Sequence, residues 1–176
     1  TDYGMLDCPQ DWNYGAPETW WAAVKNHLPD GFDAYEIQNE CGPPPQGYAY
    51  WAQWNISIAK LVQRDKNGIL LAFAFAAGNP DYPHWPDLVE YFRWVAQNPL
   101  PDGRYHGLAL HAAANATWER SDSPWVNNPH LTADRYFLFV RDVLLANTGF
   151  DLSRWPGTVA FTELGLHDGY SGNWGA

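Results

Sequence analysis

The sequence of 176 residues has few basic side chains, few cysteines and no long apolar run. Ten Lys and Arg residues stand against 20 Asp and Glu residues, which gives a formal net charge of −10. Nucleic acids and anionic membrane surfaces attract Lys and Arg, so this balance argues against both as partners. No stretch of about 18 apolar residues is present, so the sequence predicts no membrane-spanning helix.

Cysteine is scarce as well. Cys8 and Cys41 are too few for a disulfide-rich scaffold, and their spacing fits no zinc motif. One bridge is expected if the protein is secreted, and two free thiols are the alternative. The sequence offers no dedicated metal or cofactor motif, so we expect the protein to work without either.

Aromatic residues are abundant, with 11 Trp, 10 Tyr and 8 Phe. An acidic, Trp-rich chain suits neutral polar ligands such as sugars, because their C–H faces stack on indole rings while their hydroxyls meet carboxylates and amides. The simpler interpretation is that Trp fills the hydrophobic core, and we expect this of most of the 11 residues.

Helical and strand patterns alternate along the chain. The predicted helices cover 17–28, 48–65 and 86–97, with a fourth from 132 to about 147, and the predicted strands cover 33–40, 69–77, 107–113 and 157–165. Strands that alternate with helices of this length indicate an α/β fold with a parallel sheet and right-handed crossovers. No linker divides the chain, so residues 1–176 are expected to form a single domain.

Polar side chains follow the predicted strands. The first strand ends in Asn39 and Glu40, the third in His111 and the fourth in Glu163, whereas the second is followed by Asn79. In parallel α/β folds, ligands bind at the carboxyl ends of the strands. The coincidence of polarity and position therefore predicts a site at this edge of the sheet.

Two glutamates on different strand ends suit glycoside cleavage. This reaction needs a carboxylic acid that protonates the leaving oxygen and a second carboxylate at the anomeric carbon. A separation of about 5 Å lets the second carboxylate act as nucleophile with retention of configuration, and a wider separation leaves room for a water molecule and inverts it.

The motifs "EIQNE" (36–40) and "VAFTELG" (159–165) resemble strand endings of the retaining glycoside hydrolases of clan A, which are (β/α)8 TIM barrels. In that family the fourth strand closes with Asn-Glu, and the seventh commonly ends in Thr-Glu-x-Gly. Two further predicted strands lie between the motifs, as strands five and six should. The resemblance therefore implies about strands four to seven of a barrel.

The resemblance also implies roles for individual residues. Glu40 would be the acid/base and Glu163 the nucleophile of a double displacement. Asn39 would hydrogen-bond the sugar 2-hydroxyl, and His111 would lie beside the nucleophile or the substrate. For His111, a structural role is the alternative.

Other residues are candidates for substrate binding. Trp118 is expected either to stack on a sugar or to pack within its loop, and Asn79 either to contact the substrate or to serve the turn. The implied substrate is a polysaccharide or oligosaccharide, and an enzyme of this kind is expected to be secreted.

A complete barrel takes roughly 250 residues, so the resemblance covers about half of one. An open half-barrel would expose sheet edges and inner faces. We therefore expect this segment alone to be poorly stable and inactive, and an enzyme to result when further β/α units complete it.

Two other functions stay open at this point. A non-catalytic carbohydrate-binding protein could use the same fold with an incomplete site. A metal-dependent hydrolase could use Glu40, His111, Glu163 and His167, although their spacing matches no dedicated metal motif.

Overall fold

The computed structural model describes residues 15–75, 80, 82–115 and 133–167 of the chain. Helices and strands alternate throughout this part. In chain order the elements are α1 (Pro17–Val24), the 3-10 helix η2 (Lys25–His27), β1 (Ala34–Glu36), α2 (Tyr48–Lys66), β2 (Ile69–Phe75), the 3-10 helix η3 (Tyr82–Leu88), α3 (Val89–Gln97), β3 (Gly107–Asn115), α4 (Ala133–Thr148), the 3-10 helix η5 (Leu152–Arg154) and β4 (Thr158–His167).

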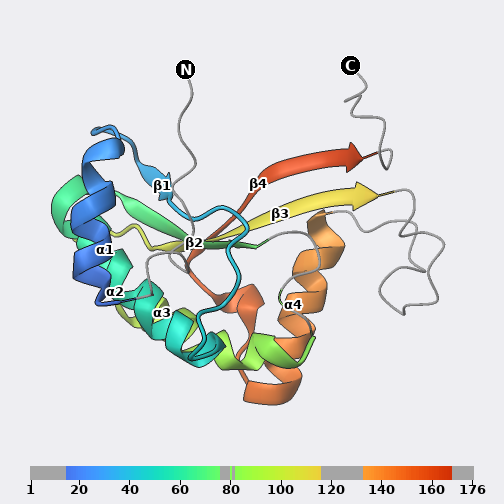
Figure 1. The fold of residues 1–176 in the computed structure, drawn as a ribbon. Helices are drawn as coiled ribbons and strands as arrows, with labels where there is room; N and C mark the ends of the chain where they lie inside the picture. Colours follow the sequence, from blue (N-terminus) through green and yellow to red (C-terminus); the bar gives the residue numbers. More distant parts are fainter. Residues whose placement is uncertain (1–14, 76–79, 81, 116–132, 168–176) are drawn as a thin grey trace.

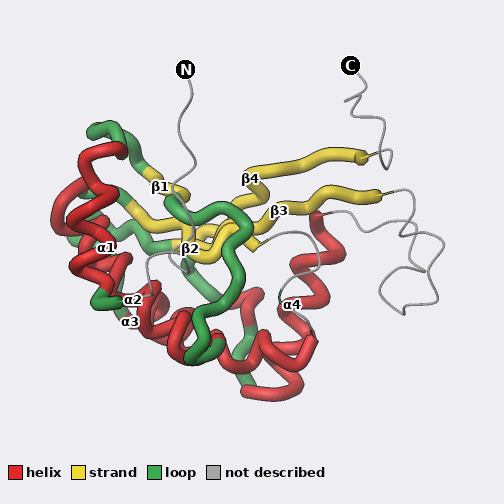
Figure 2. Tube along the Cα trace, viewed as in Figure 1, coloured by secondary structure: helices red, strands yellow, loops and turns green. Residues whose placement is uncertain are grey.

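The four strands form one parallel sheet in the order β1-β2-β3-β4. Every strand therefore pairs with the strand that follows it in the chain, and a helix lies between them. Figures 1 and 2 show the helices gathered on one side of a curled sheet. The predicted α/β class and the parallel β/α units are confirmed.

The side of the sheet that faces the helices carries an aromatic core. Trp51 of α2 meets Phe73 and Phe75 of β2 edge to face, with ring centroids 5.3 and 5.4 Å apart, and Tyr91 of α3 packs on Phe73 in the same way. Such pairs add to the free energy gained by burying apolar area. The prediction that most Trp residues fill the core is confirmed by the buried set of Trp20, Trp21, Trp51, Trp54, Trp85 and Trp155.

The opposite side of the sheet carries a smaller apolar cluster. Ile69 and Leu71 of β2 pack there with Ala74 of the same strand and Ala109 of β3. Their neighbours Leu70, Ala72 and Leu108 belong to the helix-facing core, as the alternation of side chains along a strand requires. We call this second side the inner face of the sheet.

The amino edge of the sheet, where the strands begin, is held by Arg104. Its Nη1 donates to the carbonyl and to Oδ1 of Asp33, at 3.2 and 3.0 Å, and its Nη2 donates to the carbonyl of Asn67 at 3.0 Å. Asp33 directly precedes β1, Asn67 precedes β2, and Arg104 itself precedes β3. One guanidinium thus joins the segments that lead into three strands.

His106 also lies at the amino edge and is fully buried. The backbone N–H of Leu70 donates to its Nδ1 at 2.9 Å, and its ring stacks on Trp94 with centroids 5.7 Å apart. Because Nδ1 accepts, the neutral ring carries its proton on Nε2. Burial lowers the pKa of His106 from 6.5 to about 4, because the charged imidazolium would lose its hydration.

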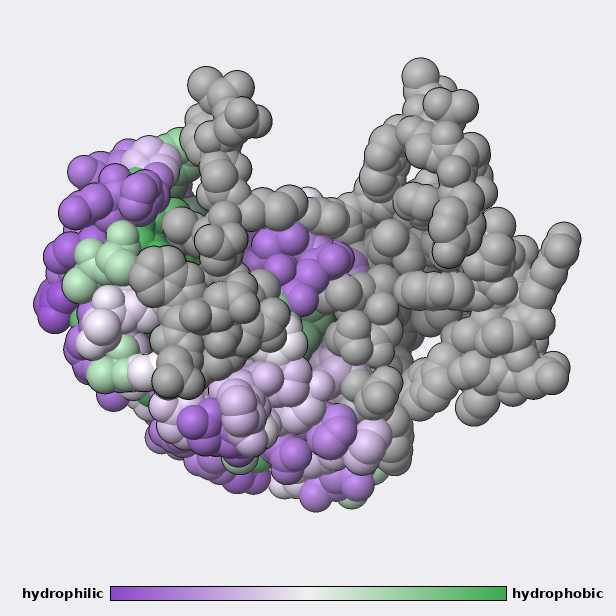
Figure 3. Space-filling view, viewed as in Figure 1, coloured by the Kyte–Doolittle hydropathy of each residue, from purple (hydrophilic) through white to green (hydrophobic). Residues whose placement is uncertain are grey.

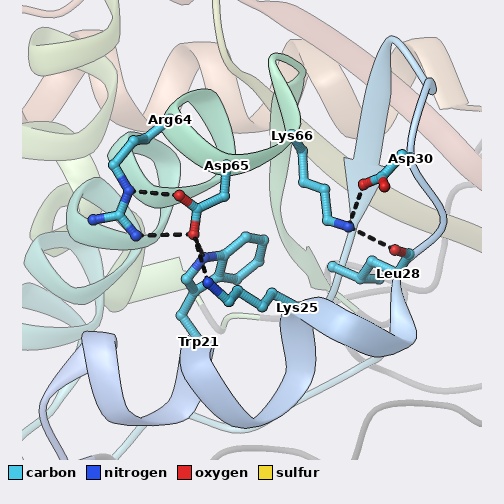
Figure 4. Close-up of polar contacts among 7 residues, drawn as sticks. All are labelled: Trp21, Lys25, Leu28, Asp30, Arg64, Asp65 and Lys66. Atoms are coloured by element: carbon cyan, nitrogen blue, oxygen red, sulfur yellow. Dashed lines mark hydrogen bonds and ion pairs between the residues drawn. The ribbon is translucent and has the colours of Figure 1, made fainter.

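The outer helices are joined by a polar cluster around Asp65, near the end of α2 (Figure 4). Its carboxylate accepts hydrogen bonds from Arg64, from Trp21 Nε1 at 2.8 Å and from Lys25 Nζ at 3.3 Å. The hydrogen bonds from Arg64 and Trp21 hold the pKa of Asp65 well below its usual range. The indole of Trp21 thereby fixes α1 against α2 at a point where its apolar ring is already buried.

A second contact in the same view fastens the segment that leads into β1. Lys66, the last residue of α2, donates to the carbonyl of Leu28 at 2.7 Å and pairs with Asp30 at 2.6 Å. Both contacts lie on the same side of the molecule as Arg104, since α2 ends where β2 is about to begin.

Three strand boundaries differ from the prediction. The strand expected over 33–40 ends its ladder at Glu36, because β1 pairs with β2 through Ala34–Glu36 alone. The strands expected to end at 113 and 165 continue to Asn115 and His167, because β3 and β4 go on pairing with each other beyond the end of β2. Figure 1 shows this two-stranded extension clearly.

The helix boundaries are closer to expectation. The helix predicted from residue 86 begins as the 3-10 helix η3, which contains Pro86, and becomes α-helical at Val89. The helix predicted over 17–28 ends its α-helical part at Val24 and continues as a 3-10 turn to His27.

The described surface in Figure 3 is mainly hydrophilic, and its apolar areas are small. Phe32 and Leu145 are the large hydrophobic side chains that stand exposed among the described residues. No helix within the described ranges is both long enough and apolar enough to cross a membrane.

Candidate active site

His111 marks the point where the sheet narrows from three paired strands to two. The pairing of β2 with β3 ends at Phe75 and Leu110. Between Leu110 and His111 the pairing of β3 with β4 shifts, so that Leu110 lies beside Phe161 while His111 lies beside Glu163. This bulge sets Glu163 at the position next to His111, on a strand about 4.8 Å away.

The ring of His111 lies between the carboxyl groups of Glu36, the last residue of β1, and Glu40, which follows that strand. Its Nδ1 is 3.1 Å from Oε1 of Glu40, and its Nε2 is 3.3 Å from Oε1 of Glu36. The His111 side chain is 1% exposed, whereas the side chains of Glu36 and Glu40 are 22% and 45% exposed. The imidazole is thus enclosed, and the outer carboxyl group, that of Glu40, is open to a ligand.

These side chains meet across β2, which lies between β1 and β3 in the sheet. On the inner face of β2, Leu71 is the register partner of Glu36. Ala74 lies further along the strand, and its carbonyl accepts a hydrogen bond from the N–H of Glu40.

The backbone around Glu40 is unusual. Glu40 has φ 52°, and Phe73 and Ala74 of β2 have φ 74° and 42°, a region that residues with a side chain seldom adopt. The N–H of Glu40 donates to the carbonyl of Ala74 at 3.0 Å, so the two irregular segments support each other. Backbone of this kind costs free energy and gathers at functional sites.

The next residue adds a covalent constraint. Cys41 takes part in a disulfide bond, whereas Cys8 lies outside the described residues. The bond decides against two free thiols. It fixes the main chain directly after Glu40, so the position of that carboxyl group depends on the oxidised state of Cys41.

Two buried polar groups on the segment that carries Glu40 have unused hydrogen-bonding capacity. Gln38 is 3% exposed, and neither its amide nitrogen nor its amide oxygen bonds to any described residue. The Oε2 atom of Glu36 is also buried and bonds to no described residue. Such groups are rare in folded proteins and are expected to bind water or a ligand.

The arrangement brings together three of the residues that the sequence predicted. Glu40 contacts His111, and Glu163 is the register partner of His111 on β4. Asn39, between Gln38 and Glu40, is partly exposed beside the carboxyl group. Asn79 and Trp118 lie outside the described residues, as do the side chains of Glu163 and His167.

Three contributions were missed by reasoning from the sequence. Glu36 was not counted among the site residues, and it is a direct partner of His111. Its place four residues before Glu40, on the same side of an extended segment, was the signal that could have shown this. The positive φ of Ala74 and the unbonded amide of Gln38 gave no comparable signal, because both depend on contacts between distant segments.

The chemistry of the cluster is that of proton transfer. A carboxyl group, an imidazole and a second carboxylate lie in one row, and all three side chains can accept or release a proton. Within the described part of the chain, no group of three or more His, Cys, Asp or Glu side chains is arranged to hold a metal ion.

Comparison of the sequence with models of protein families and with curated proteins gives no match.

Proposed function

We propose that this chain carries the catalytic centre of a retaining glycoside hydrolase built on a (β/α)8 barrel. Glu40 is the acid/base, Glu163 is the nucleophile, and the substrate is a polysaccharide or oligosaccharide. The observation that carries the proposal is the position of His111, which contacts Glu40 on one side and has Glu163 as its register partner on the other.

The proposed reaction is a double displacement. Glu40 gives its proton to the glycosidic oxygen as the bond from that oxygen to the anomeric carbon breaks, and a carboxylate oxygen of Glu163 bonds to the same carbon. Glu40 then takes a proton from water as the water oxygen attacks that carbon and releases Glu163. The 45% exposure of Glu40 is consistent with a group that must meet both the sugar and the water.

The fold supports a barrel in one specific respect. A sheet whose parallel strands pair in chain order, with the helices on a single side, has the connectivity of consecutive barrel units. A doubly wound sheet would instead reverse its strand order and carry helices on both sides.

The net charge favours a neutral substrate, and the disulfide bond favours an oxidising compartment. A net charge of −10 disfavours polyanionic ligands, so a neutral glycan is the proposed partner. A disulfide at Cys41 persists outside the cytosol, and we therefore place the protein in the extracellular space.

The test is kinetic and uses the intact protein expressed from the complete reading frame. Glu163→Ala should abolish hydrolysis of every glycoside that the wild type cleaves. Glu40→Ala should lower the rate about 10²- to 10⁴-fold on glycosides with a poor leaving group, which need protonation. The same variant should cost far less on dinitrophenyl glycosides, whose leaving group departs without a proton.

The matched control is Glu90→Ala, since Glu90 is an exposed glutamate on α3 that pairs with Arg93. It should hydrolyse both kinds of glycoside at the wild-type rate. Wild-type rates for Glu40→Ala and Glu163→Ala would disprove the assignment. Glycan binding by the wild type without any turnover would instead identify a carbohydrate-binding protein.

The stereochemical outcome is a second test. A nucleophilic Glu163 requires that the first-formed sugar has the same anomeric configuration as the substrate, and proton NMR of the early product reads this directly. An inverted product would mean that the second carboxylate activates water across a wider gap.

A further inference from the structure

We propose that Glu36 is a positioning residue that fixes the ring of His111 with its Nε2–H toward Glu36 and its bare Nδ1 toward Glu40. This inference rests on the proposed role of Glu40 as the acid/base. By this proposal, Glu36 does not contact the sugar and acts through the histidine.

The contacts define the choice between two tautomers. Neutral imidazole has one N–H donor and one bare nitrogen, and in His111 each nitrogen faces a carboxyl oxygen. In the neutral ring, one carboxyl group therefore receives the N–H, while the other meets a lone pair.

Burial decides which carboxyl group receives the proton of the ring. Glu36 is the less exposed of the two, and its Oε2 is buried without a partner among the described residues. His111 Nε2 is thus the donor on which this carboxylate depends, and a buried carboxylate without a donor would be costly. Glu40 is more exposed, so water or its own proton can satisfy its oxygens.

The described charged groups that contact the ring are both acidic, namely Glu36 and Glu40. From β4, Glu163 occupies the register position beside His111. The residues next to the ring are therefore acidic. The ring N–H points to the carboxyl group that is held most firmly.

The consequence for Glu40 is a defined hydrogen bond to its acid form. A bare Nδ1 accepts a hydrogen bond from the protonated carboxyl group through Oε1 and holds that group at the rim of the site. After Glu40 has given up its proton, the pair has no shared hydrogen, and the carboxylate is free to orient a water molecule for the second step.

The direct test is the tautomer of His111, read from the ring ¹⁵N chemical shifts of the intact protein labelled at histidine. The His111→Asn spectrum identifies the signals. We expect the Nε2–H tautomer in the wild type, and in Glu36→Gln a change of about tenfold in the tautomer ratio, because a glutamine can either donate or accept and no longer offers a charged acceptor.

Glu90→Gln, the same change at an exposed site, should leave the His111 signals unmoved. A wild-type ring with its proton on Nδ1, a ring protonated on both nitrogens at the pH of activity, or a tautomer ratio unchanged in Glu36→Gln would each overturn the proposal.

Kinetics then separate positioning from general support of the fold. Glu36→Gln should lower kcat/KM roughly tenfold on glycosides with poor leaving groups and leave the rates on dinitrophenyl glycosides close to wild type, since the latter need no acid. An equal loss on both would indicate a structural role and contradict the inference. If the wild type cleaves no glycoside at all, the proposed function fails, and the tautomer measurement still decides the placement of Glu36.

Discussion

Two buried histidines, His106 directly before β3 and His111 within β3, have opposite surroundings. His106 is fully buried between a backbone N–H and an indole ring, with its Nε2 unpaired among the described residues. His111 is buried to the same degree between two carboxyl groups. Equal burial therefore accompanies two different sets of partners.

The difference lies in which proton state each site accepts. At His106 the backbone N–H occupies the lone pair of Nδ1, so an added proton would set two donors against each other. At His111 each nitrogen faces a carboxyl oxygen, and a proton on either side finds an acceptor. The first site accepts a single proton state of its ring, whereas the tautomer at the second depends on which carboxyl group receives the ring N–H.

The same contrast holds for the edges of the sheet on which they lie. At the amino edge, Arg104 and Lys66 pair with backbone carbonyls and carboxylates. Toward the carboxyl edge, the amide of Gln38 is buried without a described partner, and the backbone at Glu40 and Ala74 has positive φ. The amino edge thus has paired polar groups, whereas the carboxyl edge has the unpaired amide and the backbone strain that are typical of functional sites.

The largest expected effect is the acid sensitivity that His106 gives to the fold. Its folded pKa of about 4 lies below the ordinary 6.5, so the unfolded chain binds the proton first as the pH falls. The free energy of unfolding should therefore decrease from about pH 6.5 down to about pH 4 and change no further through this group. The difference of the two pKa values corresponds to about 3 kcal/mol.

Urea denaturation of the intact protein at pH 7 and pH 4 measures this loss. His106→Asn should remove about 3 kcal/mol of the pH dependence, whatever it does to stability at pH 7. His27→Asn, at an exposed histidine, should keep the wild-type dependence. An unchanged pH dependence in His106→Asn would place the acid-sensitive group elsewhere.

The next expected effect is on the rate of hydrolysis and not on the free energy of unfolding. His111→Asn should lower the hydrolysis of glycosides with poor leaving groups about 100-fold, because Glu40 loses the ring that holds it in place. His106→Asn, measured at pH 7 on the folded fraction, should hydrolyse at the wild-type rate. If the two variants lose activity equally, the contrast between the two histidines is wrong.

The smallest effect concerns the amino edge alone. Arg104→Gln should lower the free energy of unfolding by about 1 to 2 kcal/mol, since it removes hydrogen bonds from a charged donor to two backbone carbonyls. Arg154→Gln, at a side chain that is 88% exposed, should change it by less than about 0.5 kcal/mol. Chemical denaturation at pH 7 compares them, and equal losses would mean that Arg104 contributes no more than an ordinary surface charge.

Much of the fold could be predicted from the sequence because its signals are local. Apolar spacing and the bracketing Gly and Pro residues mark each helix and strand, and their alternation implies a parallel sheet. The grouping of Glu40 with His111 followed from the rule that strand ends meet at one edge. These predictions needed no knowledge of how one strand is aligned with the next.

The remainder depends on alignment between strands. The bulge at His111 and the irregular backbone of β2 arise from pairing between segments more than 30 residues apart, which no local pattern encodes. The partnership of Glu36 with His111 follows from those shifts. His106 was overlooked for the same reason, because its role comes from Leu70 and Trp94 on other elements.

The irregular backbone of β2 also has an evolutionary consequence. Glycine would relieve the positive φ at Phe73, but the phenyl ring there is fully buried between Trp51, Phe75 and Tyr91, so that exchange would empty part of the core. Ala74 is fully buried on the inner face, so a larger side chain there would crowd Leu71 and Ala109. Selection should therefore keep a large side chain at Phe73 and a small side chain at Ala74. We expect natural variation in this segment to be narrow even though its conformation is one that neither residue prefers.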